Sequence, residues 1–258
     1  MKSYDLHTHL FTTWEQGRFS LERTPRDVDL IIDSIKQAGL EGIALVNFED
    51  IRFEEFAAEA RVHFGKYKLM REIVNALSFT DGDSVFRVIR GQEIPTSEGH
   101  VLALGGNGFA RIPRGLSLKD TLDEADNAGI PVIADHPLGY MGIGGKRLSD
   151  YSERFAAYEA FNGNYKSIID CEFAGDLNGI AVSDSHNLKD LGNGHVNFSR
   201  DIDFSRENNL RDSLKAMLAS GEFRVSVRRR NPFSSKLGHV VTAVYDAKIR
   251  VKLGWLEV

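Results

Sequence analysis

Residues 24–46, TPRDVDLIIDSIKQAGLEGIALV, decide the fold class of this chain. A threonine cap and a first-turn proline precede a predicted helix over residues 26–38, and Gly39 ends that helix. The apolar run 42–46 then predicts a strand, and residues 4–6 predict another strand upstream. A strand, a helix and a strand therefore follow one another at the start of the chain.

The alternation of strands and helices continues and predicts an α/β architecture. Further strands are expected at 86–94, 101–104, 131–134, 157–161 and 180–182, and a helix at 117–128. Between them, residues 51–77 predict a long amphipathic helix or a helix pair. Repeated strand–helix units favour a parallel barrel or a doubly wound sheet.

The C-terminal part differs in character from the rest. It predicts a helix at 208–220, a strand at 223–227 and a candidate hairpin at 240–253. We therefore expect one domain over residues 1–200 and a C-terminal α+β segment over residues 201–258.

The composition narrows the classes of function. The chain has 258 residues and a single cysteine, Cys171, which excludes an internal disulfide and a cysteine-rich zinc module. A transition-metal site would have to use His, Asp and Glu. The net charge of −5 argues against tight binding of long duplex nucleic acid. With no secretory signal and no membrane-spanning apolar run, we expect a cytoplasmic protein without a membrane partner.

Histidines and carboxylates gather where the predicted strands end. His7 and His9 leave the first strand two residues apart, so both imidazoles can reach one cation. Later strand ends carry Glu93, His100, His136, Asp184 and His186. The carboxyl ends of parallel strands form the active-site edge of a barrel. One such histidine alone would be interpreted as structural, but the whole set predicts a metal site.

Six motifs carry a family resemblance. They are DLHTH (5–9), GQEI (91–94), EGHVLALG (98–105), ADHP (134–137), YEAFNG (158–163) and SDSH (183–186). In this order they resemble the motifs of the polymerase and histidinol phosphatase (PHP) family of metal-dependent phosphoesterases, over about residues 3–190. The resemblance implies a distorted seven-stranded β/α (TIM-like) barrel with two or three divalent metals, commonly zinc, manganese or iron.

The resemblance also implies a ligand set. One metal would be bound by His7, His9, Glu93 and Asp184, and a second by Glu93, His100 and His136. Glu93 would then bridge two cations and offset their repulsion. His186 would bind a third metal or contact the phosphate directly.

The sequence departs from the family pattern at two ligand positions. Trp14 and Phe48 stand where many members carry metal ligands, and a phenylalanine cannot bind a metal. Either the third site is lost, or Glu15, Glu49 or Asp50 replaces the missing ligand. We therefore favour a two-metal centre over a three-metal centre.

The expected activity is hydrolysis of a small phosphomonoester, or of a nucleotide, by a metal-bound hydroxide held at Glu93. His186 or His195 would assist the leaving oxygen, although His195 also fits a surface loop. Asn162, Arg114 and Arg147 are candidates for substrate binding. A turn-forming role for Asn162 and simple solvent exposure of the two arginines are the alternatives.

Two rival functions remain open at this point. An amidohydrolase-like enzyme would share His-x-His and a late Asp, but its pattern would include a bridging lysine or its equivalent. A metal-binding PHP-like protein with weak or no catalysis would fit the altered ligand positions Trp14 and Phe48.

Overall fold

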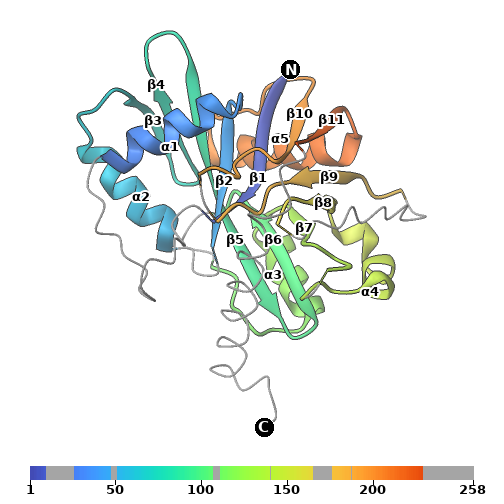
Figure 1. Cartoon of the computed structure of the whole chain (residues 1–258). Helices are drawn as coiled ribbons and strands as arrows, with labels where there is room; N and C mark the ends of the chain where they lie inside the picture. Colours follow the sequence, from blue (N-terminus) through green and yellow to red (C-terminus); the bar gives the residue numbers. More distant parts are fainter. Residues whose placement is uncertain are drawn as a thin grey trace, which may run out of the picture.

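The computed structural model describes residues 1–9, 26–47, 51–106, 111–139, 141–164, 176–186 and 188–228. Its eleven described strands are β1 (Lys2–Thr8), β2 (Gly42–Asn47), β3 (Lys68–Ile73), β4 (Ala76–Thr80), β5 (Val85–Thr96), β6 (Gly99–Leu104), β7 (Val132–Ala134), β8 (Ala157–Asn162), β9 (Gly179–Val182), β10 (Gly194–Phe198) and β11 (Phe223–Val227). Nine of them follow one path, in the order β11–β10–β1–β2–β5–β6–β7–β8–β9. The structure is thus a mixed α/β fold around one long, curved sheet (Figure 1).

The sheet curves until its β9 end reaches β1, so that it forms a nearly closed barrel. Thr8 at the end of β1 bridges to Ser185 after β9, and the His9 N–H donates to the Ser185 carbonyl at 2.7 Å. The buried Asp5 carboxylate accepts from the backbone N–H groups of Ser183 (3.0 Å) and Gly192 (2.9 Å). Burial raises the pKa of Asp5 to about 6, and these hydrogen bonds oppose the increase. Asp5 therefore fastens β1 to the chain on either side of the seam.

The strand directions differ from those of a parallel barrel. β1, β2 and β5 are parallel to one another, as are β7, β8 and β9, but β6 is antiparallel to both of its neighbours. Only two residues, Ser97 and Glu98, connect β5 to β6, and such a short connection allows a hairpin but not a parallel crossover. The structure therefore confirms a mixed α/β fold with a barrel-like sheet, but not a barrel of parallel strands.

The path has nine strands, whereas the resemblance implies seven. The two additional strands are β10, which is antiparallel to β1, and β11, which is antiparallel to β10. The loop position expected for His195 was wrong, because His195 lies in β10. A Cβ at Gly194 would lie 2.2 Å from the Val182 carbonyl oxygen, so this glycine allows two backbones to approach closely.

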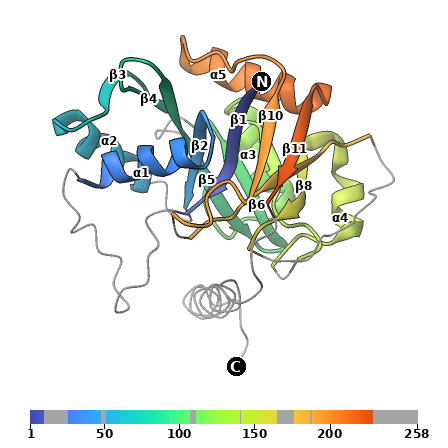
Figure 2. The same cartoon turned by 45° about the horizontal axis from the view of Figure 1, so that its top comes forward.

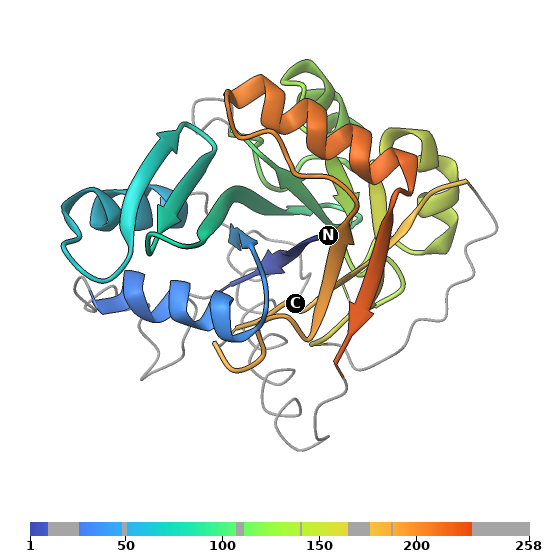
Figure 3. The ribbon, with the colours of Figure 1, turned by 90° about the horizontal axis from the view of Figure 1, so that it is seen from above.

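Five α-helices are described, α1 (Arg26–Gln37), α2 (Ile51–Val62), α3 (Leu118–Asn127), α4 (Gly145–Asp150) and α5 (Glu207–Ser220), together with a short 3₁₀-helix at Ser152–Arg154. In Figures 1 and 3, α1 and α2 cover one side of the barrel, and α3 and α4 cover the other. Figure 2 shows α5 beside the end of the barrel where β1 begins. Within the described ranges, no helix has both the length and the apolar character that a membrane span requires.

The barrel interior is filled by apolar side chains from every part of the path. Leu6, Val46, Ile89 and Leu102 are fully buried there and share this core with Leu214 of α5. Residues 201–228 therefore pack on the same core as the barrel strands. The predicted domain boundary at residue 200 stays a prediction, and the candidate hairpin at 240–253 lies outside the described residues.

The predicted helix or helix pair over residues 51–77 is wrong beyond Val62. Helix α2 ends there, and the chain continues into the antiparallel hairpin β3–β4, whose second strand pairs with β5. Leu77 and Phe79 are completely buried two residues apart on β4, the period of a strand, whereas Phe64 is 98% exposed. The pairing of β4 with β5 therefore determines the structure after Val62, and not the helix-like spacing of the apolar residues.

The helix signals elsewhere agree with the structure. Ser117 caps α3, because its hydroxyl accepts from the Asp120 N–H at 3.1 Å and donates to the Asp120 carboxylate. Gly39 has a φ of +70° just after α1, the left-handed conformation of a helix end. The predicted start of α1 at Thr24 and Pro25 lies outside the described residues.

Gly91 provides a test of barrel packing. It lies on β5 directly opposite Val46 of β2, and a Cβ at this position would lie 2.3 Å from Val46 Cγ1. We expect Gly91→Ala to lower the free energy of unfolding by about 1–3 kcal/mol through overpacking, measured by urea denaturation. Gly106→Ala is the control, since a Cβ there meets only Ile130 Cδ1 at 3.7 Å. Equal stability of the two variants would contradict the described packing.

Candidate metal centre

The candidate metal centre is a buried polar layer that adjoins the apolar core of the barrel. Within β6, and across the ends of β7 and β9, a core residue and a candidate ligand lie two residues apart. These pairs are Leu102 and His100, Ile133 and Asp135, and Val182 and Asp184. The strands that build the core therefore also determine where the ligands lie.

A bulge in β1 directs His7 into this layer. The pairing with β2 shifts register between Asp5 and Thr8, so that Leu6 lies in the apolar core while His7 and His9 both join the ligands. Thr8, between the two histidines, donates its hydroxyl to the Ala44 carbonyl at 2.8 Å. The predicted pairing of His7 and His9 on one side is confirmed, with a bulge that the sequence pattern did not indicate.

One group of potential ligands contains His7, His9 and Asp184. The Nε2 atoms of His7 and His9 are 2.8 Å apart, and each lies 3.4 Å from Asp184 Oδ1. Glu93 Oε2 adds a fourth donor atom, 3.1 Å from His9 Nε2 and 4.0 Å from His7 Nε2. All four residues of the first predicted metal set are therefore together.

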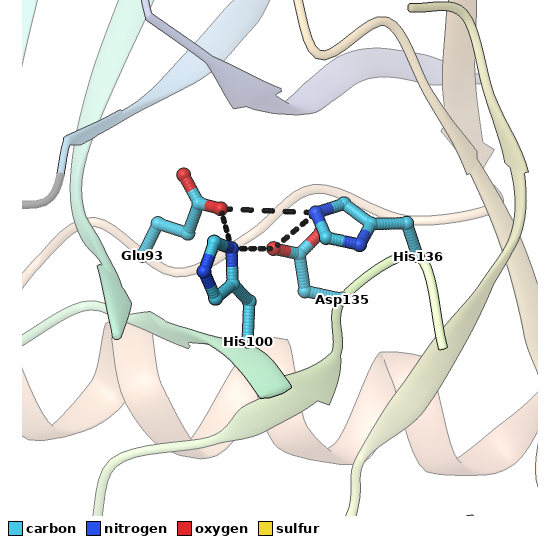
Figure 4. Close-up of side chains that lie close together, drawn as sticks. All are labelled: Glu93, His100, Asp135 and His136. Atoms are coloured by element: carbon cyan, nitrogen blue, oxygen red, sulfur yellow. Dashed lines mark hydrogen bonds and ion pairs between the residues drawn. The ribbon is translucent and has the colours of Figure 1, made fainter. Parts of the chain in front are cut away.

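A second group contains Glu93, His100, Asp135 and His136 (Figure 4). Glu93 Oε1 lies 2.6 Å from His100 Nδ1 and 3.8 Å from His136 Nε2. Asp135 Oδ2 lies 3.1 Å from His136 Nε2 and 4.0 Å from His100 Nδ1. The second predicted set is also assembled, with Asp135 as an additional member.

Glu93 belongs to both groups through different atoms. Its Oε2 faces His7 and His9, and its Oε1 faces His100 and His136. A carboxylate that offers one oxygen to each of two donor sets has the arrangement needed to bridge two cations.

His100 reaches the site from the beginning of a strand, whereas we expected it at the end of one. It is the second residue of β6, not a residue after the end of a strand. Because β6 is antiparallel to β5, its beginning lies at the same edge as the end of β5. The expectation that every ligand follows the carboxyl end of a strand was therefore wrong at this position.

Two ligand positions have an unusual backbone. His136 has a φ of +25° and Asp184 a φ of +48°, in a region that residues other than glycine rarely occupy. At the end of β7 this conformation allows the consecutive residues Asp135 and His136 to reach the same group. Such strain is retained where the surrounding structure enforces it, commonly at functional sites.

The buried charges control one another. Burial would raise the pKa of Glu93, but the imidazoles of His100, His136 and His9 outweigh it and hold that pKa well below its usual range. Burial would lower the pKa of His7, but Asp184, Glu159 and Asp135 raise it well above the usual value, and Asp135 does the same for His136. Without a metal, protons on His7 and His136 offset part of the carboxylate charge.

Some carboxylate oxygens in the site are not satisfied by hydrogen bonds. Among the described residues, both oxygens of Asp135 and Oδ1 of Asp184 are buried without a hydrogen-bond partner, although they face imidazole nitrogens. Burial raises the pKa of Asp135 well above its usual range. A buried oxygen without a hydrogen bond is costly unless a cation binds it. The residues therefore fit one or two metal ions with nitrogen and oxygen ligands.

His186 lies at the margin of this layer. Its ring lies 4.6 Å from that of His9, and its Nδ1 lies 3.0 Å from the Asp184 carbonyl oxygen. Burial and the neighbouring His9 lower the pKa of His186 to about 4, so it is neutral at pH 7. Its side chain is 22% exposed, more than those of His7 and His9.

The other predicted residues are more distant from the ligands or untested. Asn162 is buried and donates to Glu159 at 2.9 Å. The Nδ1 atom of His195 lies 3.1 Å from the Gly192 carbonyl oxygen. This contact gives His195 no role in the candidate metal centre. Arg114 lies half-buried before α3 and Arg147 lies exposed on α4, so their part in substrate binding stays a prediction.

Two residues of the centre were missed in the sequence analysis. Asp135 precedes His136, and Glu159 lies three residues before Asn162 in a quoted motif. Glu159 forms a further group with His7 and Asp135. Asp135 could have been predicted from the sequence, because it is a carboxylate next to the predicted ligand His136 at the end of a strand. The positions Trp14, Glu15, Phe48, Glu49 and Asp50 lie outside the described residues.

Comparisons with known proteins show the fold only. No family model matches the sequence, and no curated protein matches it. Similar solved structures include the crystal structure of PsfC from Pseudomonas syringae PB-5123, with a TM-score of 0.60 and 15% sequence identity. That similarity covers 96% of this chain and 98% of the PsfC chain, so the two proteins share their architecture over nearly their full lengths.

Metal binding is expected to release protons. The pKa values of His7 and His136 are raised well above 6.5, so both imidazoles hold protons near neutral pH that a metal must displace. The affinity for Mn²⁺ should therefore rise from pH 6 to pH 8, by about tenfold per pH unit for each proton released. Calorimetry in buffers of different ionisation enthalpy counts those protons. Binding that is independent of both pH and buffer would contradict the ligand assignment.

Proposed function

We propose that this protein is a metal-dependent phosphoesterase of the PHP type, with a centre of at least two divalent metals. The observation that carries the proposal is the division of Glu93 between two sets of imidazoles. Two sets of nitrogen and oxygen donors that share one carboxylate are typical of two-metal hydrolases. The resemblance of the six sequence motifs supports the proposed family, for which a distorted TIM-like barrel would be expected.

The metals would be zinc, manganese or iron, all of which accept imidazole and carboxylate ligands. When bound, they would polarise a phosphoryl group and make a water molecule more acidic. His7, His9 and Asp184 would hold one ion, His100, Asp135 and His136 the other, and Glu93 both. This assignment explains why the unsatisfied oxygens of Asp135 and Asp184 lie where they do.

His186 would handle a proton or contact the substrate. Its Nδ1–H is directed to the Asp184 carbonyl, which leaves Nε2 as the acceptor of a neutral ring. A neutral imidazole at the partly exposed margin suits a proton acceptor at pH 7. A hydrogen bond from the substrate or its attacking water would then end at Nε2.

The substrate would be a small phosphomonoester, with a nucleotide as the next candidate, in a cytoplasmic setting. The net charge of −5 disfavours long polyanions. An amidohydrolase-like C–N hydrolase is less well supported, because the group between the two donor sets is Glu93 and not a lysine.

Glu93→Gln tests the proposed function. The amide keeps the size of the side chain but removes the charge and one acceptor oxygen, so we expect loss of both metals and a fall in phosphatase activity of about 100-fold or more. Elemental analysis and a screen of phosphomonoesters, nucleotides and amides with Mn²⁺, Zn²⁺ and Fe²⁺ would measure this.

Glu41→Gln is the matched control for that experiment. Glu41 accepts from the Ser3 N–H at the beginning of β1, the opposite end of the strand from His9, and should leave metal content and activity unchanged. Wild-type protein that binds metal but hydrolyses only amides, or nothing, would contradict the proposed function. So would full activity of Glu93→Gln.

His186→Ala separates metal binding from chemistry. Because we assign no metal to His186, the variant should retain both ions and lose about 10²-fold or more in kcat. The acidic limb of the pH–rate profile should also change. Unaltered kcat with full metal content would show that His186 takes no part in the reaction.

A further inference from the structure

Glu159 of β8 is a buried carboxylate to which the proposed function gives no role. Its exposed fraction is 1%, and its oxygens contact both groups of ligands. Oε1 accepts from His7 Nδ1 at 2.7 Å, and Oε2 accepts from the backbone N–H of His136 at 3.0 Å. One side chain thus holds an imidazole of the first group and the main chain of a ligand in the second.

The contacts of Glu159 distinguish it from a metal ligand. Both of its oxygens already accept hydrogen bonds, since Asn162 Nδ2 also donates to Oε2 at 2.9 Å. His7 Nδ1 donates to Glu159, and it is the opposite ring nitrogen, Nε2, that faces His9 and Asp184. A ligand histidine whose second nitrogen donates to a carboxylate has its tautomer and its ring orientation fixed.

The network continues from Glu159 to a third ligand. Asn162 Oδ1 accepts from the Asn164 N–H at 3.0 Å, and the Asn164 side chain donates to Asp184 Oδ2 at 3.3 Å. A register shift in the pairing of β8 with β9, between Glu159 and Phe161, allows residues 159 and 162 to meet despite their odd spacing. Hydrogen bonds therefore link His7, His136 and Asp184 through Glu159.

We propose that Glu159 is a positioning residue that couples the two metal pockets, so that its loss weakens metal binding in both although it binds neither ion. The proposal depends on the metal centre of the proposed function but not on its substrate. The left-handed backbone at His136 supports it, because the hydrogen bond from the His136 N–H to Glu159 secures that conformation.

Glu159→Gln is the appropriate change because all three partners of the Glu159 carboxylate are hydrogen-bond donors, and the NH₂ group of a glutamine cannot accept from them. Whichever way the glutamine is turned, its NH₂ group faces either the His7 Nδ1–H or the N–H groups of His136 and Asn162. The volume of the side chain is unchanged. Glu41→Gln again provides the control, as a carboxylate that accepts a backbone N–H far from the ligands.

The experiment is titration of the full-length metal-free protein with Co²⁺, followed by visible absorption, which reports both affinity and ligand geometry. For Glu159→Gln we expect affinity about 10–100-fold weaker in both binding steps, the same stoichiometry at saturation and altered absorption bands. If this variant does not fold, Asn162→Ala carries the test. It removes one of the three donors and should weaken binding severalfold.

The outcomes separate this inference from the proposed function. Affinity and spectrum of Glu159→Gln equal to those of wild type would overturn the positioning role while leaving the metal centre intact. Loss of one ion per chain even at saturating Co²⁺ would also overturn it, because Glu159 would then be a ligand. A wild-type protein that binds Co²⁺ as described but hydrolyses no phosphoester would overturn only the proposed function.

Discussion

The division of one carboxylate between two pairs of imidazoles is the interaction on which the rest of the centre depends. Glu93 lies 3% exposed, and burial of its charge in an apolar barrel would be prohibitive without partners. His9 and His100 supply those partners on its two oxygens. The remaining carboxylates in turn require the imidazoles to hold protons or metals, and so the whole cluster acts as one unit.

The barrel positions this unit through departures from regular strands. A bulge in β1 directs His7 inward, an antiparallel β6 brings His100 to the shared edge, and a left-handed backbone places Asp135 and His136 together. Asp5 closes the seam between β1 and the segment after β9. These irregularities have a cost in local stability, and the large apolar core beneath the ligands offsets it.

The sequence predicted which residues gather in the candidate metal centre better than it predicted the strand arrangement. His7, His9, Glu93, His100, His136 and Asp184 were identified because residue type and position at strand ends are local properties. Strand direction was not predictable in this way, since the hairpin between β5 and β6 and the pairing of β10 with β1 depend on distant contacts. For the same reason the sequence did not predict the hairpin β3–β4, which begins inside the range 51–77 that was expected to be helical.

Residues that act through a neighbour were the hardest to identify. Glu159 binds the far side of the His7 ring, a contact across 152 positions of sequence that neither spacing nor composition reveals. Asp135 was not predicted because the neighbouring His136 was interpreted as the ligand at that strand end. Chemistry-bearing residues at a strand edge can thus be recognised from sequence, but the hydrogen bonds that orient them require the fold.

Anomalous diffraction from crystals grown with Mn²⁺ would test whether Glu93 bridges two metal ions. We expect two peaks about 3.5–4 Å apart, on either side of the Glu93 carboxylate. One peak should lie among His7, His9 and Asp184, and the other among His100, Asp135 and His136. A single peak, or manganese bound away from Glu93, would contradict the bridging role of Glu93.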